Sequence, residues 1–168
     1  MTFNSVLLTS FTTWEAHQRS NSSDDVVAEI ERNPTKPGLH FLRQLPVDFH
    51  QAPAWAITHV TQLQPQAIAL CGMAEGRSKL SLESRAVVNG EILHTTVDLN
   101  GLLPALTISE ISHDAGQYVC NALYYAMLKH LRDRRSEVPC LFIHIPVLTH
   151  QNRAAILADF QQIIAQLV

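Results

Sequence analysis

The sequence predicts an α/β fold, a three-layer α/β/α sandwich around a central mixed, mostly parallel sheet. Its clearest signals are short apolar segments without polar alternation, which are typical of strands buried on both faces. Three segments have this character: Val6–Phe11, Ala67–Met73 and Cys140–Ile145. Amphipathic helical patterns separate them, and a length of 168 residues suits one compact unit. We therefore expect residues 1–168 to form a single domain.

The first half of the chain alternates between helical and extended patterns. Residues 24–32 begin with acids and end with a base, which is the charge order that a helix dipole favours. Residues 39–49 have an extended pattern, although Pro46 weakens a strand there. Residues 52–63 place apolar side chains at helical spacing, and Pro65 ends that helix.

The second half continues this alternation with one gap. Residues 81–96 are extended, and Asn89 followed by Gly90 is a strong signal for a hairpin turn. Residues 102–112 show no pattern that assigns them to a helix or a strand. Residues 152–168 form a helix with one apolar face.

The composition excludes several classes of partner. A formal net charge of -3 with 12 Lys and Arg gives no electrostatic case for nucleic acid or an anionic membrane. No apolar run reaches the roughly 20 residues that a membrane span needs. The cysteine count is odd and the N-terminus lacks a secretory signal, so we expect free thiols in a reducing compartment, the cytoplasm.

No cofactor or metal is expected. The sequence lacks the glycine-rich dinucleotide and phosphate loops and the G-x-S-x-G nucleophile elbow. Side chains of metal-ligand type occur at His113, Asp114, His144 and His150, but their spacing matches no recognised site.

The segment 112–133 places Cys120 near the start of a long amphipathic helix. A helix N-terminus favours the thiolate, which is the nucleophilic form of cysteine. A capping box between Asp114 and Gln117 would put Cys120 in the second turn, whereas a start delayed by Gly116 would put it in the first. The alternative is an inert core thiol, because Cys120 also lies on the apolar stripe of this helix.

Two further side chains are able to act with a thiol if the fold brings them close. Alternation places His144 on the strand face opposite Ile143 and Ile145, where its ring needs a polar partner. Glu83 follows the loop after the strand Ala67–Met73. Active sites in such sheets lie at the carboxyl ends of strands, so these side chains can meet Cys120 at one edge. The alternatives are a satisfied core histidine and a surface carboxylate.

Four segments together carry a resemblance to a known family. They read VLLTSFTTW at 6–14, QPQAIALCGMAEGRSKLSLESRA at 64–86, AGQYVCNALYY at 115–125 and FIHIPVL at 142–148. The pair AG-x-YVCN and FIHIP is the most specific part. The chain resembles the pyroglutamyl peptidases, also called pyrrolidone-carboxylate peptidases, which are cytosolic cysteine exopeptidases.

The resemblance implies Cys120 as nucleophile, His144 as general base and Glu83 as the residue that orients His144. It implies a thioester between the cysteine and a pyroglutamyl group, formed without a cofactor. Aromatic walls suit the flat lactam ring of that group. The substrate-binding positions implied are Phe11, Trp14, Tyr118 and Met73.

The chain departs from the family pattern near the site. Ser10 and Met73 stand where the family has Gly and Gln, and the segment between Asn89 and Ala115 is shorter. These departures leave open a hydrolase of the same fold for a different N-acyl or cyclic-amide substrate, and a catalytically silent binding protein. The expected partner is a peptide or small amide substrate, and a homo-oligomer is an alternative to a monomer.

Overall fold

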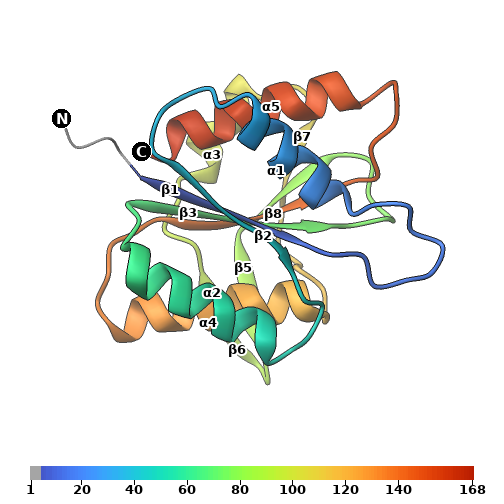
Figure 1. Cartoon of the computed structure of the whole chain (residues 1–168). Helices are drawn as coiled ribbons and strands as arrows, with labels where there is room; N and C mark the ends of the chain where they lie inside the picture. Colours follow the sequence, from blue (N-terminus) through green and yellow to red (C-terminus); the bar gives the residue numbers. More distant parts are fainter. Residues whose placement is uncertain (1–4) are drawn as a thin grey trace.

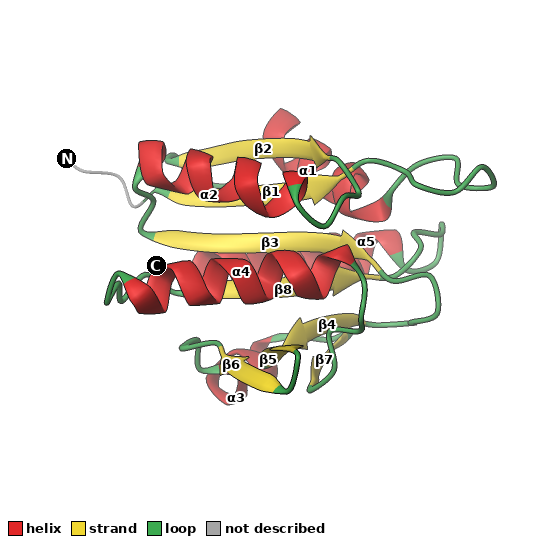
Figure 2. Cartoon of the chain, turned by 90° about the horizontal axis from the view of Figure 1, so that it is seen from below, coloured by secondary structure: helices red, strands yellow, loops and turns green. Residues whose placement is uncertain are grey.

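The computed structural model describes residues 5–168; residues 1–4, the start of the N-terminal stretch in which no secretory signal is expected, lie outside the described residues. A six-stranded sheet crosses the centre of the molecule in the order β2-β1-β3-β8-β4-β7 (Figure 1; Figure 2). In chain order its strands are β1 Val6–Phe11, β2 Leu39–Leu45, β3 Ala67–Met73, β4 Leu80–Glu83, β7 Ser109–Ser112 and β8 Cys140–Ile145.

The sheet is mixed and mostly parallel, which confirms the predicted fold class. β1 pairs in parallel with β2 and β3, and β3 pairs in parallel with β8. β4 runs antiparallel to β8, and the edge strand β7 is parallel to β4. The boundary between β8 and β4 is therefore the place where the sheet changes direction.

Helices cover both faces of the sheet, so the molecule has three layers (Figure 1). The helices α1, α3 and α5 lie on one face, and α2, α4 and a two-stranded hairpin lie on the other. Their bounds are α1 Ser22–Arg32, α2 Gln51–Leu63, α3 Leu99–Leu102, the 3-10 helix η1 Leu103–Ala105, α4 Val119–Asp133, α5 Arg153–Gln166, and the hairpin strands β5 Arg85–Val88 and β6 Glu91–His94.

Each helical layer packs a separate apolar core against the sheet, because successive strand residues point to opposite faces. Leu8 and Ile143 lie in the core with Phe160 of α5. Leu70 and Phe142 lie in the other core, under α4. Residues next to each other in β8 therefore face different layers, and His144 shares the α4 side with Phe142.

Most expected elements are present. The three apolar strands have the predicted limits, and the expected helices differ from the observed ones by no more than two residues at either end. Asn89 and Gly90 form the hairpin turn, with positive φ angles of 51° and 81°.

The structure corrects the limits of one expected element and resolves two points that the sequence left open. The extended segment 39–49 stops at Leu45, because Pro46 has no N–H to donate to a neighbouring strand. The unassigned segment 102–112 contains η1 and the edge strand β7. Glu83 lies in the segment 81–96, which was expected to be extended, as the last residue of β4. It is fully buried, so the alternative of a surface carboxylate is wrong.

Candidate active site

A cleft of about 460 Å³ opens where β1, β3 and β8 end. Six of the seven site residues predicted from the sequence line it. They are Phe11, Trp14, Met73, Tyr118, Cys120 and His144. The seventh, Glu83, is fully buried and touches His144 from within the sheet.

Cys120 lies in the first turn of α4, which settles the two alternatives for the helix start. The helix begins at Val119, after Tyr118 in the extended N-cap position. The capping box is not formed, because Asp114 Oδ1 accepts from the N–H of Gly116 at 2.9 Å. Gly116 has a φ of +80°, which turns the chain into the helix one turn later than a cap at Asp114 would.

Gly72 of β3 lets the sulfur of Cys120 lie directly on the sheet. A Cβ atom at this position would be 2.6 Å from Cys120 Sγ and 2.9 Å from Phe142 Cζ. Gly72 is paired in register with His144 of β8. The sulfur therefore lies over the strand adjacent to His144, on the same face as its ring.

His144 and Glu83 form a hydrogen-bonded pair on that face. His144 Nδ1 lies 2.7 Å from Glu83 Oε1, across the antiparallel β8–β4 boundary. Glu83 is opposite Phe142 in the register, so its side chain reaches His144 as a diagonal neighbour. A carboxylate only accepts hydrogen bonds, so Nδ1 carries the proton and Nε2 is left with the lone pair.

Two aromatic side chains support this pair from the α4 side. The O–H of Tyr124 donates to the backbone carbonyl of Glu83 at 2.8 Å. The Phe142 ring packs between Tyr124 and His144, with centroid distances of 5.7 Å and 4.8 Å. The imidazole is therefore held by packing as well as by its hydrogen bond.

Arg77, in the loop between β3 and β4, joins the carboxylate of Glu83 to the loop before α4. Its Nη1 donates to Glu83 Oε1 at 2.6 Å, and its Nη2 donates to the backbone carbonyl of Asp114 at 2.7 Å. Oε1 thus serves both His144 and Arg77. Oε2 is buried and has no hydrogen-bond partner among residues 5–168.

The thiol of Cys120 is neutral at physiological pH. Burial, together with the negative charge of Glu83, raises its pKa from 9.0 to about 12, although its own backbone N–H and Arg77 oppose the rise. Cys120 is still the most accessible cysteine, because Cys71 and Cys140 are fully buried and burial also raises their pKa. A base would therefore be needed for this sulfur to act as a nucleophile.

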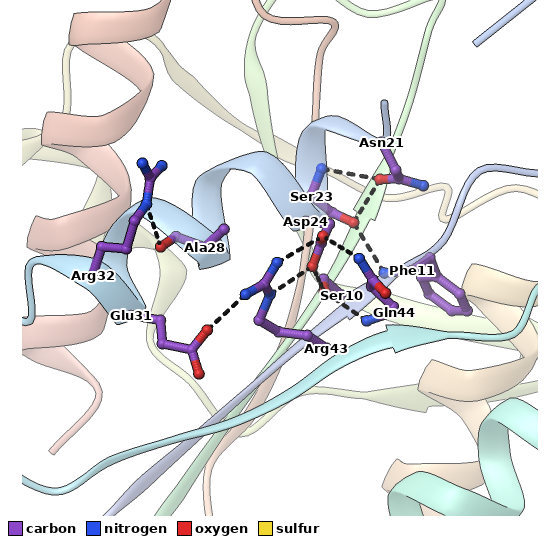
Figure 3. Close-up of polar contacts among 10 residues, drawn as sticks. All are labelled: Ser10, Phe11, Asn21, Ser23, Asp24, Ala28, Glu31, Arg32, Arg43 and Gln44. Atoms are coloured by element: carbon purple, nitrogen blue, oxygen red, sulfur yellow. Dashed lines mark hydrogen bonds and ion pairs between the residues drawn. The ribbon is translucent and has the colours of Figure 1, made fainter. Parts of the chain in front are cut away.

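Figure 3 shows how the end of β1, which carries Phe11, is held. Ser10 Oγ donates to Asp24 Oδ1 at 2.7 Å and accepts from the N–H of Gln44 at 3.1 Å. Arg43 donates to both oxygens of Asp24, at 2.8 and 3.0 Å. Ser10, where the resembling family has Gly, thus links β1 to α1 and β2.

The backbone of Phe11 is tied to the start of α1. Its N–H donates to Ser23 Oγ at 3.2 Å, and Asn21 Oδ1 accepts from both Ser23 Oγ and the Ser23 N–H (Figure 3). The amide of Asn21 also donates to the carbonyl of Thr12 at 3.0 Å. These bonds fix the aromatic wall at the point where the chain leaves the sheet.

The other predicted wall residues occupy different parts of the cleft. Trp14 and Tyr118 are exposed, on the loop after β1 and at the start of α4. Met73 is buried, and its Sδ accepts from the N–H of Ser22 at 3.3 Å. The thioether of Met73 therefore contacts the N-terminus of α1.

Sequence reasoning did not assign roles to Gly72, Arg77 or Tyr124. Arg77 lies inside the Gly-Arg loop that carries part of the resemblance, so the signal for it was present. The contacts of Gly72 and Tyr124 depend on how α4 crosses the sheet, which no local pattern reveals.

Among residues 5–168, no cluster of three or more His, Cys, Asp and Glu side chains is arranged to hold a metal ion. His113, one of the ligand-type residues, instead lies with Nδ1 2.7 Å from Ser84 Oγ. Within the same range, every helix is too short or too polar to traverse a bilayer.

Comparison with known proteins gives consistent matches. A family model described as pyroglutamyl peptidase matches residues 93–159. A pyrrolidone-carboxylate peptidase from Deinococcus radiodurans is 31% identical over 170 residues, covering 84% of this chain and 77% of the relative. One from Halalkalibacterium halodurans is 29% identical over 171 residues, covering 85% and 84%.

Solved structures share the fold over nearly the whole chain. A mutant pyrrolidone carboxyl peptidase from Pyrococcus furiosus superposes with a TM-score of 0.83 at 21% identity, covering 96% of both chains. Pyroglutamyl peptidase I from Bacillus amyloliquefaciens gives a TM-score of 0.82 at 20% identity, covering 95% of this chain and 94% of that one.

Proposed function

The chain belongs to the pyroglutamyl peptidase family, and we propose that this single-domain cysteine peptidase removes an N-terminal pyroglutamyl group from peptides. The proposed roles are nucleophile for Cys120, general base for His144, and orientation of His144 for Glu83. One observation carries these roles: the Cys120 sulfur lies over Gly72, beside a histidine whose Nδ1 is held by a buried carboxylate.

The first half of the reaction forms a thioester. The flat lactam ring lies against the aromatic walls at Phe11 and Trp14. His144 Nε2 takes the thiol proton as the sulfur attacks the acyl carbon, because the pKa of Cys120 is too high for a resting thiolate. The C–N bond then breaks, and His144 returns the proton to the leaving amine.

The second half releases pyroglutamate. His144 takes a proton from a water molecule, whose oxygen attacks the thioester carbon, and the Cys120 sulfur leaves and is reprotonated. Backbone N–H groups in the first turn of α4 have no intrahelical partner, so they are able to stabilise the oxyanion in both halves.

The proposed compartment is the cytoplasm. The mechanism needs Cys120 as a free thiol, and thiols stay reduced in the cytoplasm. Cys120 is unpaired in the structure, as are Cys71 and Cys140.

The direct test is turnover of a fluorogenic pyroglutamyl amide beside alanyl and prolyl amides. We expect hydrolysis of the pyroglutamyl amide alone, and a loss of about a thousandfold or more in Cys120→Ala. Cys140→Ala is the matched control, because that cysteine is buried in β8 outside the cleft, and this variant should keep its activity.

Labelling with iodoacetamide provides a second readout that does not depend on the substrate. Peptide mapping of the native protein should show Cys120 modified faster than Cys71 and Cys140, because only Cys120 is accessible. Equal, slow labelling of all three cysteines would contradict the nucleophile assignment. Cleavage of the alanyl or prolyl amide in place of the pyroglutamyl one would contradict the substrate.

A further inference from the structure

A second hollow lies on the other side of the loop that precedes the nucleophile. It has a volume of about 610 Å³ and runs between the start of α2, the β5–β6 hairpin and the N-terminus of α4. Its apolar walls are Phe49, Val87 and Tyr118, which are 51%, 39% and 69% exposed. Large apolar side chains left this exposed along one hollow are typical of a binding surface.

The groove adjoins the catalytic cleft. Gly116, Gln117 and Tyr118 line both hollows, so the loop before Cys120 forms a ridge between them. Nothing lies within 4 Å of the position that a Cβ would take at Gly116. An extended chain is therefore able to cross from Cys120 into the groove over bare backbone.

The hairpin side of the groove is fixed before any ligand arrives. The side chain of Asn121 accepts from the N–H of Val87 at 3.0 Å and donates to its carbonyl at 2.7 Å, which ties β5 to the first turn of α4. Arg85 Nε donates to the carbonyl of His113 at 2.8 Å. A rigid apolar wall loses little entropy when it binds a side chain.

The opposite rim of the cleft has a different chemistry. Glu15 and Glu75 lie there, and His17 Nε2 is 2.9 Å from Glu75 Oε1. A peptide whose first residue occupies the cleft thus leaves it either over a charged rim or across the ridge into an apolar groove.

We propose that the groove of Phe49, Val87 and Tyr118 binds the residue that follows the pyroglutamyl group, and that it selects peptides with a large apolar side chain there. This inference rests on the proposed function, because the cleft must hold the pyroglutamyl ring for the next residue to reach the groove. Burial of that side chain against the aromatic walls stabilises the transition state as well as the bound substrate, because the leaving residue stays attached until the C–N bond breaks.

The test uses pyroglutamyl-X amides in which X is Gly, Leu, Phe, Lys or Glu, with the release of X-amide measured by mass spectrometry. We expect kcat/KM for Leu and Phe to exceed that for Gly by about tenfold or more, which is the range that apolar pockets achieve for a few methylene groups. Lys and Glu should be no better than Gly.

Variants locate this preference in the groove. Phe49→Ala and Val87→Ser should each lower the Leu-to-Gly ratio of kcat/KM several-fold, and two positions guard against a folding defect in one. Trp55→Ala is the matched control: Trp55 is 53% exposed on α2 but outside the groove, so its loss should not change the ratio.

The possible results separate the two proposals. Cleavage of all five amides at similar rates, or a Leu preference that survives both groove variants, would overturn the groove. A preference for Lys that disappears in Glu75→Gln would place the leaving peptide on the charged rim and overturn it too. A chain that cleaves none of these amides would overturn the proposed function together with the groove.

Discussion

Two buried carboxylates, Glu83 in β4 and Asp159 in α5, are satisfied in opposite ways. Asp159 is 2% exposed, and both of its oxygens accept hydrogen bonds from the segment 107–109. Glu83 is 0% exposed, and one oxygen serves two donors while the other has none among the described residues.

The difference reflects what each carboxylate holds. Asp159 receives two backbone N–H groups and two hydroxyls at 2.7 to 3.1 Å, which fix the chain at the start of β7. Glu83 binds two side chains that carry or exchange protons, His144 and Arg77. A buried polar group without a partner costs about 1–3 kcal/mol. We infer that Glu83 serves the site at some expense of stability, whereas Asp159 serves stability alone.

The largest expected effect comes from Glu83→Gln. The neutral amide no longer stabilises the imidazolium that forms during catalysis, so kcat should fall by about a thousandfold or more. The free energy of unfolding should change little, because the carboxylate is incompletely satisfied in the folded state. Steady-state kinetics and urea unfolding measure the two effects. A variant that keeps a tenth of its activity would place Glu83 among the structural residues.

Arg77→Gln should have a smaller effect, a fall in kcat/KM of about 10- to 100-fold. Arg77 lowers the pKa of Cys120, so its loss raises that pKa further and disfavours the thiolate. Iodoacetamide labelling of Cys120 at fixed pH should therefore slow. Arg77→Lys keeps the charge but not the two-pronged geometry, so it should restore labelling more than turnover. Unchanged labelling in Arg77→Gln would limit Arg77 to a structural role.

Asp159→Asn is the reverse test and should affect stability rather than turnover. An amide cannot accept from all four donors, so we expect a loss of about 1–3 kcal/mol in the free energy of unfolding at pH 7. Turnover at temperatures where the variant stays folded should match that of the unsubstituted chain. A tenfold loss of kcat would show that Asp159 also supports the site.

The loss of unfolding free energy in Asp159→Asn should depend on pH. Burial alone would raise the pKa of Asp159, but hydrogen bonds from Thr107, Ser109 and Ile108 outweigh it and lower the pKa below 3.8. A carboxyl whose pKa is lowered by folding stabilises the protein above its unfolded pKa and loses that effect as the pH falls. The difference from the unsubstituted chain should therefore be largest at neutral pH and shrink below about pH 4.

The smallest effect is expected for Met73→Gln, which adds a polar group beside the site. A Gln carbonyl is able to accept from the N–H of Ser22 in place of the thioether, and its amide offers a donor to the lactam. We expect hydrolysis of pyroglutamyl amides to be equal or improved by no more than a few-fold in kcat/KM. Abolished turnover of these amides would show that the pocket requires the thioether.

The sequence predicts the buried parts of the fold best. Ala67–Met73 and Cys140–Ile145 have the expected limits because strands apolar on both faces leave a continuous signal. The strand Ser109–Ser112 was not predicted, because a short and polar edge strand leaves no continuous apolar signal. The direction of β4 against β8 depends on pairing between segments about sixty residues apart, which no local pattern specifies.

In the candidate site, too, some features could be predicted from the sequence and others could not. The resemblance predicted catalytic roles for Cys120, His144 and Glu83 from their motifs. These roles stay a prediction, and the structure brings Glu83 into contact with His144. The two contacts of Arg77 and the approach of Cys120 to Gly72 depend on how separate segments cross in space. Motifs and residue types are enough to name candidate residues, whereas the contacts that set their geometry and pKa require the tertiary structure.

The position of β8 has a consequence for how the chain is made. Among residues 5–168 it is the last strand in sequence order, yet it lies between β3 and β4 in the middle of the sheet. A nascent chain that ends after α4 has the thiol of Cys120 but neither His144 nor the strand that joins Glu83 to the sheet. Because domains fold as units during synthesis, we expect Cys120 to be activated only after β8 has been synthesised. Chains that end before β8 would then be released without peptidase activity.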